Sequence, residues 1–381
     1  MEEDSYTERK PEISFLDDED GNVATAKLLF AGNSEVDAGI GGTRYAAGES
    51  GTLVSKNFCA DQRVDAFSKV ISVRKPITVV IPTYNRASIL AKALEGYREQ
   101  SSPDLIRELI IIDDGSTDNT SSIVKQFSNQ PSFPIRYFHQ SNKGPAAARN
   151  LGIREAQSSV ILFTDSDIVP ERNLVAEHVH FHEDQPALNA AVLGYVTWSP
   201  EIRTTPFMRW YGEERMFEFK RLRDNAEVSY RYFYTCNISL KTEFLRASGG
   251  FDEDFKSAAY EDSELGFRLS KMGLQLLYNR AAIGYHYQFF SFEDACKKAV
   301  SNVASAEVFS RKEAGQQMQK DAELRHTRVG FGLAKGFAKR IVKVLHPARH
   351  LLDSAFPLPG RVYHLFYWEA TREAGKPKPF G

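Results

Sequence analysis

The sequence predicts an α/β fold in which a mostly parallel, Rossmann-like sheet is flanked by helices. Short apolar runs rich in β-branched residues alternate with stretches of helical periodicity, as in strand–helix–strand units. Polar and acidic residues follow these runs directly, and ligands of open α/β sheets bind at the carboxyl ends of the strands. The pattern covers residues 76–290, which we expect to form the main domain.

The composition is that of a globular protein with a substantial core. The chain has 381 residues, of which 42% are hydrophobic and 26% charged, and its net charge of −2 gives no general basic field for nucleic acid. Cys59, Cys236 and Cys296 are far apart, which favours reduced thiols over disulfides or a zinc site. No apolar run is long enough to serve as a signal segment or to span a bilayer, so a cytoplasmic protein is expected.

Residues 1–75 are interpreted as an N-terminal extension, partly disordered or glycine-rich β structure. The first twenty residues are acidic and polar. The stretch Gly39-Ile-Gly-Gly42 invites comparison with a phosphate-binding loop, but Arg44 stands where a third glycine of Gly-x-Gly-x-x-Gly is needed. A structural role is therefore favoured over a nucleotide site.

The main domain is expected to open with a strand and a helix. The β-branched run of residues 77–81 stops at Pro82-Thr83-Tyr84-Asn85-Arg86, where proline and asparagine break a strand. The helix that follows would present one apolar face, made by Leu90, Ala93, Leu94 and Tyr97.

The next two strands are residues 108–112 and 135–138. The first ends in Asp113-Asp114-Gly115-Ser116, and Ser116 or Thr117 is expected to cap the following helix. After the second comes Lys143-Gly144-Pro145, with proline suited to the first turn of a helix.

A fourth apolar run, residues 160–163, leads to Asp165-Ser166-Asp167. Two carboxylates at a strand end repel each other and lose hydration. A divalent cation relieves both costs, and Mg²⁺ or Mn²⁺ prefers one or two carboxylates together with phosphate oxygens. An Asp-x-Asp also occurs in solvated turns, so its position directly after a buried strand is what favours a metal site.

These motifs, in this order, resemble family 2 glycosyltransferases with a GT-A fold. The resemblance is carried by Val80 to Asn85, the Asp113–Asp118 turn, Asn142-Lys-Gly with Ala148-Arg-Asn150, and Asp165-Ser-Asp167. Asn237, Gly249-Gly-Phe-Asp252 and Glu261-Asp262 resemble the family's second half. The likeness covers about residues 76–290 and includes neither the first seventy-five residues nor the last ninety.

The resemblance implies a nucleotide-diphospho-sugar donor, for which uridine diphosphate is the family's commonest carrier. It also implies Mn²⁺ or Mg²⁺ and transfer to a hydroxyl, usually with inversion. The acceptor would be a saccharide or a lipid-linked sugar, in polysaccharide, glycolipid or glycoconjugate synthesis. The donor-binding candidates are Pro82, Thr83, Tyr84, Asn85, Arg86, Asp113, Asp114, Lys143, Gly144, Arg149, Asp165 and Ser166. The alternatives are ordinary turn chemistry for the loop residues and a solvated helix position for Arg149.

The resemblance also implies which residues bind the metal and which residue acts as the catalytic base. Asp167 is the first candidate for direct metal ligand, with Asp165 reaching the metal or the ribose through water. His286 follows an apolar strand and is a further candidate ligand, or else a structural histidine. Asp262 is the candidate base and Glu261 its supporting residue, although carboxylates at a helix start also serve as caps.

The aromatic segment at residues 206–234 suits either a sugar acceptor or ordinary packing, and packing is favoured. Beyond residue 290 the pattern is helical to residue 381. Residues 326–350 combine basic and apolar side chains at helical spacing, which suits either contact with the inner face of the cell membrane or packing on the catalytic domain.

Two other functions stay open. A sugar-1-phosphate nucleotidyltransferase would need a glycine-rich loop after the first strand, where this chain has Pro82-Thr83-Tyr84-Asn85. A non-catalytic protein that binds a sugar nucleotide is disfavoured, because Asp165, Asp167 and Asp262 are all present.

Overall fold

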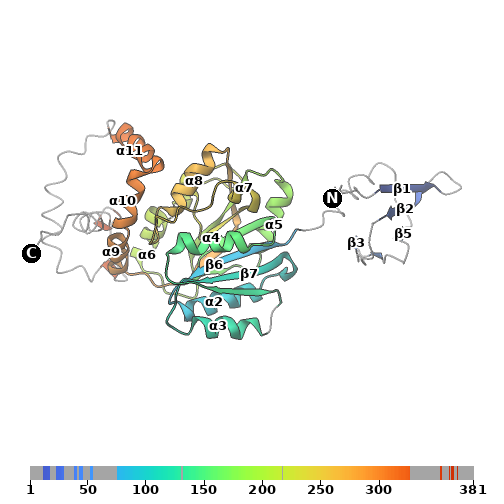
Figure 1. Ribbon diagram of the computed structural model, residues 1–381, viewed down its shortest axis with the longest axis horizontal. Helices are drawn as coiled ribbons and strands as arrows, with labels where there is room; N and C mark the ends of the chain where they lie inside the picture. Colours follow the sequence, from blue (N-terminus) through green and yellow to red (C-terminus); the bar gives the residue numbers. More distant parts are fainter. Residues whose placement is uncertain are drawn as a thin grey trace, which may run out of the picture. The chain divides into compact units, whose positions relative to one another are not determined.

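The computed structural model describes residues 75–129, 132–216 and 218–326, with short strands between residues 12 and 54 and a few positions from 352 to 367 (Figure 1). Within helices, the side chains of residue 213 and of residues 322–326 are outside this description. The basic segment at residues 326–350, a candidate for membrane contact, lies outside the described residues apart from the backbone of His326.

The chain divides into two compact units, Met1–Arg74 and Lys75–Gly381. In the first, the described residues form a three-stranded antiparallel sheet in the order β1-β2-β5 and a separate hairpin of β3 and β4. The bounds are β1 (Glu12–Asp17), β2 (Val23–Leu29), β3 (Ala38–Ile40), β4 (Thr43–Tyr45) and β5 (Thr52–Val54).

The described part of Lys75–Gly381 is built on an eight-stranded mixed sheet in the order β10-β13-β11-β12-β9-β6-β7-β8. The pairs β8–β7, β7–β6, β6–β9 and β11–β13 are parallel, whereas β12 is antiparallel to both of its neighbours and β10 is antiparallel to β13. The bounds are β6 (Ile77–Thr83), β7 (Ile106–Asp113), β8 (Ile135–His139), β9 (Val160–Thr164), β10 (Ile168–Pro170), β11 (Ala190–Trp198), β12 (Asn237–Lys241) and β13 (Gln275–His286).

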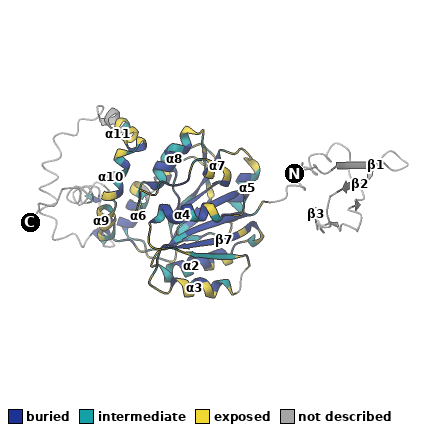
Figure 2. Cartoon of the chain, in the orientation of Figure 1, coloured by how far each residue is buried: buried dark blue, intermediate teal, exposed yellow. Residues whose placement is uncertain are grey.

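Helices cover both faces of this sheet (Figure 1). One apolar core packs α2 (Ala87–Arg98), α3 (Thr120–Ser128) and α5 (Leu174–Asp184) on one face. The other packs α4 (Pro145–Glu155), α7 (Thr242–Ala247) and α8 (Glu261–Lys271) on the opposite face. The expected apolar face of α2 is confirmed, since Leu90, Ala93, Leu94 and Tyr97 are buried, and Figure 2 shows the exposed outer turns of α3 beside the buried strand β7.

The strand directions decide where the site lies. Because β12 runs against both β9 and β11, the strands β6, β7, β9, β11 and β13 all point the same way. Their carboxyl ends therefore share one edge of the sheet. The predicted α/β fold with its parallel strands is confirmed, and the residues that follow each strand are brought to a common edge.

In the described residues up to 326, the sheet is followed by α9 (Phe292–Ser301), α10 (Val303–Arg311) and α11 (Glu313–His326). Ser291 and Asp294 form a capping box at the start of α9, each side chain accepting a backbone N–H of the other residue. Both α10 and α11 pack against α8, so these helices extend the sheet domain. In the described part of the chain, no helix has the length and apolarity needed to cross a membrane.

One expected helix start is wrong. Neither Ser116 nor Thr117 caps α3, which begins at Thr120 after Asn119. Asp118 instead accepts hydrogen bonds from the backbone N–H and the hydroxyl of Thr120, and from the backbone N–H of Ala87. Ser116 and Thr117 are used to join two loops of the candidate site.

Candidate active site

The loop after β6 is tied to the loop after β7. The backbone N–H of Asn85 donates to Ser116 Oγ at 2.8 Å, and Asn85 Oδ1 accepts from the backbone N–H of Thr117 at 2.8 Å. Asn85 has φ 51°, a left-handed conformation that asparagine tolerates better than most residues. The loop leaves the Tyr84 ring 46% exposed at the sheet edge.

Pro82 and Thr83 are the last residues of β6. Thr83 is buried, and its hydroxyl has no hydrogen-bond partner among the described residues. A buried hydroxyl without a hydrogen-bond partner carries a free-energy penalty. A polar group of a ligand that bonds to the Thr83 hydroxyl would remove this penalty.

Asp113 and Asp114, which follow β7, organise the neighbouring loops. Asp113 accepts from the backbone N–H of Ser116 at 2.7 Å and from the Tyr137 hydroxyl at 2.6 Å. Asp114 Oδ1 and Oδ2 accept from the backbone N–H groups of Lys143 and Gly144, each at 2.8 Å. These bonds support the turn-forming interpretation of both aspartates, which shape the edge on which a donor would lie.

Gly144 needs to be glycine. Its φ is 93°, and a Cβ there would lie 2.5 Å from the backbone oxygen of Lys256. The loop of Asp114, Lys143 and Gly144 can therefore pass close to the segment before α8 only without a side chain at this position.

Arg149 on α4 is buried, so the alternative of a solvated helix position is wrong. Its Nη2 lies 2.9 Å from Asp165 Oδ1, and its Nη1 lies 3.0 Å from Glu261 Oε1. The guanidinium also lies over the Phe251 ring, 5.7 Å from its centroid. Arg149 thus connects the carboxylate after β9 with the start of α8.

Asp165, Ser166 and Asp167 follow β9 at the sheet edge. Asp165 is the more exposed aspartate, with 37% of its side chain accessible against 10% for Asp167. Arg86 forms an ion pair with Asp167 through Nη1. Burial favours the neutral acid, but His286 when protonated and the Arg86 guanidinium outweigh it and hold the pKa of Asp167 below its usual value.

The strand pairing brings His286 to Asp167. Ile168, the first residue of β10, lies opposite His286, the last residue of β13, and the backbone N–H of Tyr287 donates to the Asp167 carbonyl at 2.7 Å. His286 Nε2 is 3.8 Å from Asp167 Oδ2. Burial lowers the pKa of His286, which leaves its imidazole neutral near pH 7, the form that binds metals.

The pair of Asp167 and His286 fits a divalent cation. Two ligands that are each about 2.1 Å from one metal lie roughly 3.0–4.2 Å apart, and the observed separation of 3.8 Å falls within that span. The described residues contain no group of three or more His, Cys, Asp or Glu side chains that could hold a metal. A cation here would therefore need oxygen ligands from water or from a bound phosphate, and Arg86 would have to leave Asp167.

Glu261 and Asp262 are the first two residues of α8, but their surroundings differ. Glu261 is buried against Arg149. Among the described residues Asp262 forms no ion pair, and burial and the charge of Glu261 outweigh the charge of Arg149 and raise its pKa to about 7. Tyr260 holds the cap position, so Asp262 is not the cap residue, but it lies in the first turn as a dipole partner would, and its Oδ1 accepts the backbone N–H of Ser263 at 2.7 Å. An aspartate with a pKa near 7 is suited to act as a base at neutral pH.

The backbone before α8 is strained. Ala259 and Tyr260 have φ values of 91° and 75°, which L-residues with side chains rarely adopt. The chain turns here directly before two consecutive carboxylates, of which Glu261 pairs with Arg149. Such strain is typical of segments that position functional groups.

The aromatic segment at residues 206–234 serves mainly for packing, as favoured. Phe207 and Tyr211 of α6 (Pro206–Tyr211) are buried in a cluster with Phe292, Leu352 and Tyr363. The Phe207 and Tyr363 ring centroids are 5.7 Å apart. Residues near the described end of the chain thus cover α6.

The sequence pointed to no role for two further residues near the metal candidate. Gln288 Oε1 accepts from Arg86 Nη1 at 3.4 Å, and Trp198 packs edge-on against His286 with centroids 5.0 Å apart. Trp198 is the last residue of β11, and Gln288 lies two residues beyond the end of β13. A position at the end of an apolar run was the signal in the sequence that could have identified them.

Comparisons with known proteins agree with this architecture. Residues 78–247 match the family model described as Glycosyl transferase family 2. A validoxylamine A glucosyltransferase of Streptomyces hygroscopicus subsp. jinggangensis (strain 5008) is 30% identical over 232 residues, 55% of this chain and 54% of the relative. A chondroitin synthase of Escherichia coli is 28% identical over 267 residues, 62% of this chain and 38% of the relative.

Among solved structures, a mannosyltransferase from Pyrobaculum calidifontis in complex with GDP-Man and Mn²⁺ is similar with a TM-score of 0.52. It is 19% identical, and the match covers 80% of this chain and 88% of that one. The chain spans about half the length of the curated glucosyltransferase relatives it matches. Taken with the sheet and the order of its motifs, these matches show that the domain containing residues 78–247 belongs to glycosyl transferase family 2 and has the GT-A fold.

Proposed function

We propose that this chain is a metal-dependent glycosyltransferase that moves a sugar from a nucleotide-diphospho-sugar to an acceptor hydroxyl with inversion. The observation that carries the proposal is the meeting, at one sheet edge, of a metal-compatible pair and a carboxylate suited to act as a base. The pair is Asp167 and His286, 3.8 Å apart, and the carboxylate is Asp262, whose pKa is about 7.

The donor would lie over β6, β7 and β9. Thr83 offers a buried hydroxyl without a partner among the described residues, and Tyr84 offers an exposed ring for the base or ribose. Asp113 and Asp114 would act by holding the loops, since their oxygens already accept bonds from them. The fold relative bound to GDP-Man and Mn²⁺ makes a nucleotide sugar and Mn²⁺ the first ligands to test.

Asp167 and His286 would hold Mn²⁺ or Mg²⁺, with Asp165 and Ser166 beside the ribose and Arg86 released toward the diphosphate. When bound, the cation supplies Lewis-acid neutralisation of the charge that develops on the leaving nucleoside diphosphate. The backbone N–H of Lys143 donates to Asp114, so Lys143 belongs to the loops at the donor edge of the sheet and can add positive charge there.

Asp262 would take the proton of the acceptor hydroxyl as the new glycosidic bond forms. An inverting transfer needs a base on the face of the sugar opposite the leaving group. Glu261 would support it indirectly, because its ion pair with Arg149 fixes the first turn of α8 while its charge raises the pKa of Asp262.

An assay of reaction products tests this proposal against the two alternatives. Wild-type protein is incubated with a panel of nucleotide sugars and Mn²⁺. Release of nucleoside diphosphate, without formation of a nucleoside triphosphate from added pyrophosphate, supports a transferase. Formation of pyrophosphate from a sugar phosphate and a nucleoside triphosphate would establish the nucleotidyltransferase, and binding without any turnover would establish a non-catalytic protein.

We further propose a role in the synthesis of a polysaccharide, glycolipid or glycoconjugate, with the enzyme in the cytoplasm. Residues 326–350 would add contact with the inner face of the cell membrane through their basic and apolar side chains. Flotation with anionic liposomes at low and high salt tests this part separately. Protein that stays in the soluble fraction at low salt would overturn the membrane contact and leave the enzymatic proposal intact.

A further inference from the structure

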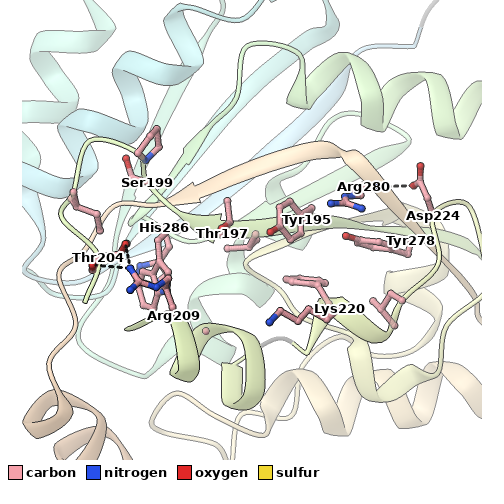
Figure 3. A pocket seen from close by; sticks show the side chains of 17 residues that line it. Tyr195, Thr197, Ser199, Thr204, Arg209, Lys220, Asp224, Tyr278, Arg280 and His286 are labelled. Atoms are coloured by element: carbon pink, nitrogen blue, oxygen red, sulfur yellow. Dashed lines mark hydrogen bonds between the residues drawn. The ribbon is translucent and has the colours of Figure 1, made fainter. Parts of the chain in front are cut away.

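A cavity of about 630 Å³ lies beside the candidate metal site (Figure 3). It is lined by the second half of β11, by Tyr278, Arg280 and His286 along β13, and by the chain segment that runs from Ser199 to Asp224. His286, the candidate metal ligand, forms part of its wall. The cavity is therefore next to the place where the leaving group of a donor would be.

The sheet order separates this cavity from the candidate donor edge. The donor candidates follow β6, β7 and β9, whereas the cavity is lined from β11 and β13, on the other side of β12. All five strands have their carboxyl ends at the same sheet edge. A second substrate in this cavity would therefore lie outside the strands that carry the donor candidates.

Aromatic rings make one wall of the cavity. The Phe219 ring stacks on Tyr278, with centroids 5.7 Å apart and an interplanar angle of 16°, and meets Tyr195 edge-on at 5.4 Å. Trp198 is anchored by its Nε1, which donates to the Met208 carbonyl at 2.8 Å. Fixed rings with a few polar groups are typical of pockets that hold an organic ring.

Arg280 and Asp224 bring charge to the end of the cavity where Tyr195 and Tyr278 lie (Figure 3). Arg280 lies where β13 has three extra residues relative to β11, since Gly194 pairs with Asn279 and Tyr195 with Ile283. The backbone N–H of Arg280 donates to Asp224 Oδ1 at 2.8 Å, which braces this bulge (Figure 3). A bulge redirects side chains, and here it places an arginine at the cavity.

The arginines of the cavity differ from those of the catalytic edge. Arg86 and Arg149 each pair with a carboxylate. In the described part of the chain, the Arg280 guanidinium has no carboxylate partner, and Arg209 Nη1 donates only to the carbonyl and hydroxyl of Thr204. A guanidinium binds carboxylates and phosphates through two parallel hydrogen bonds, so these two arginines match an anionic group.

We propose that this cavity binds the acceptor, and that the acceptor is a saccharide with an anionic group, a carboxylate or a phosphate. Arg280 binds the anion at the end of the cavity where Tyr195, Phe219 and Tyr278 support the sugar ring, and Arg209 lies at the other end (Figure 3). The inference rests on the proposed function, because the bound saccharide is an acceptor only if the chain is a glycosyltransferase. The cavity's preference for an anionic saccharide can be measured without turnover.

The test is a binding titration of matched saccharides in the absence of donor. The panel contains a uronate-bearing oligosaccharide, a sugar phosphate, and the neutral sugars of the same ring structure. Wild-type protein, R280Q, R209Q and the control R223Q are compared. Arg223 is exposed in the same segment but does not line the cavity.

We expect the anionic saccharide to bind at least about tenfold more tightly than its neutral counterpart. Because a charge-assisted hydrogen bond contributes about 1.5–3 kcal/mol, R280Q should lose roughly tenfold or more of that affinity, with R223Q unchanged. R209Q, at the other end of the cavity, should lose less affinity than R280Q. The uronate and the phosphate arms show which of the two anions is preferred.

Equal affinity for neutral and anionic members, no binding of any member, or full affinity in R280Q would overturn the inference. Nucleoside diphosphate is titrated in parallel with Mn²⁺, and its affinity should be the same in R280Q and wild type. A parallel loss of nucleoside diphosphate affinity would make the cavity part of the donor site and contradict the assignment. If the anionic preference is found but no nucleotide sugar is turned over, the proposed function fails while the anion site stands.

Discussion

Arg149 and Glu261, 112 residues apart in the sequence, form a buried ion pair in which Nη1 lies 3.0 Å from Oε1. Only 5% of each side chain is accessible. The same guanidinium also binds Asp165, so one arginine fixes the carboxylate after β9 relative to the first turn of α8. The position of the candidate base therefore depends on a residue that need not touch substrate.

Replacing this arginine should destabilise the fold. R149Q leaves Glu261 buried without its partner, and removal of one member of a buried ion pair costs about 3–5 kcal/mol. We expect a loss of that order in the free energy of unfolding, measured by urea denaturation. R154Q is the control, because Arg154 is exposed on the same helix and should change stability by no more than about 0.5 kcal/mol.

A double variant separates the ion pair from general damage to α4. In R149Q/E261Q both charges of the buried pair are removed, so the double variant should lose less than the sum of the single losses. Strict additivity would show that Arg149 and Glu261 do not stabilise each other, and would contradict the positioning role.

Much of the fold followed from the sequence because its signals are local. Residues 77–81, 108–112 and 160–163 combine β-branched and apolar side chains, and each forms a strand of the sheet. The start of α3 was misplaced because Ser116 and Thr117, good capping residues, bond to Asn85 instead. A propensity at one position cannot reveal a partner thirty residues away.

Arg86 should compete with the metal for Asp167. In R86Q the ion pair is gone, so we expect Mn²⁺ to bind about fivefold more tightly without donor, since a half-exposed ion pair contributes about 1 kcal/mol or less. Isothermal titration calorimetry with Mn²⁺ alone gives the affinity. R107Q, an exposed arginine of β7, should match wild type. Unchanged or weaker Mn²⁺ binding in R86Q would mean that the cation does not use Asp167.

Asp262 should be needed for transfer and much less for donor binding. General base catalysis contributes about 10²–10⁴-fold, so D262N should lower kcat by that order while the donor Kd stays within about twofold. The wild-type rate should rise with pH to a plateau above about 7, because the base must be deprotonated and its pKa is about 7. A full rate in D262N would move the base elsewhere.

The Asp262 carboxylate should lower the free energy of unfolding at high pH. Its pKa in the folded protein, about 7, is above the value of about 3.9 expected when unfolded, so folding favours the protonated form. The cost is absent below pH 4 and grows as the pH rises from 4 to 7. D262N should therefore raise Tm at pH 8 relative to wild type more than it does at pH 4.5. Equal Tm differences at the two pH values would show that the pKa of Asp262 is not raised.

The candidate site was predictable where polar residues directly follow strands. Asp165, Asp167 and His286 share the sheet edge because β9 and β13 end there, and the antiparallel pairing of β10 brings the histidine close. The anchoring of Arg149 by Glu261 and the bulge that carries Arg280 were not predictable. Both depend on the register between segments that are distant in the sequence, and no local periodicity encodes that register.

Nucleoside diphosphate release tests whether Asp167 belongs to a metal-dependent donor site. Wild-type protein and D167N are incubated with the nucleotide-sugar panel, with Mn²⁺ or with a chelator, and Tm is measured on both. Asn keeps the shape of Asp and removes the charge, so D167N should stay folded with a Tm close to that of wild type. We predict release by wild type with Mn²⁺ for at least one donor, and no metal-dependent release by D167N. Equal Mn²⁺-dependent release by folded D167N would contradict the account.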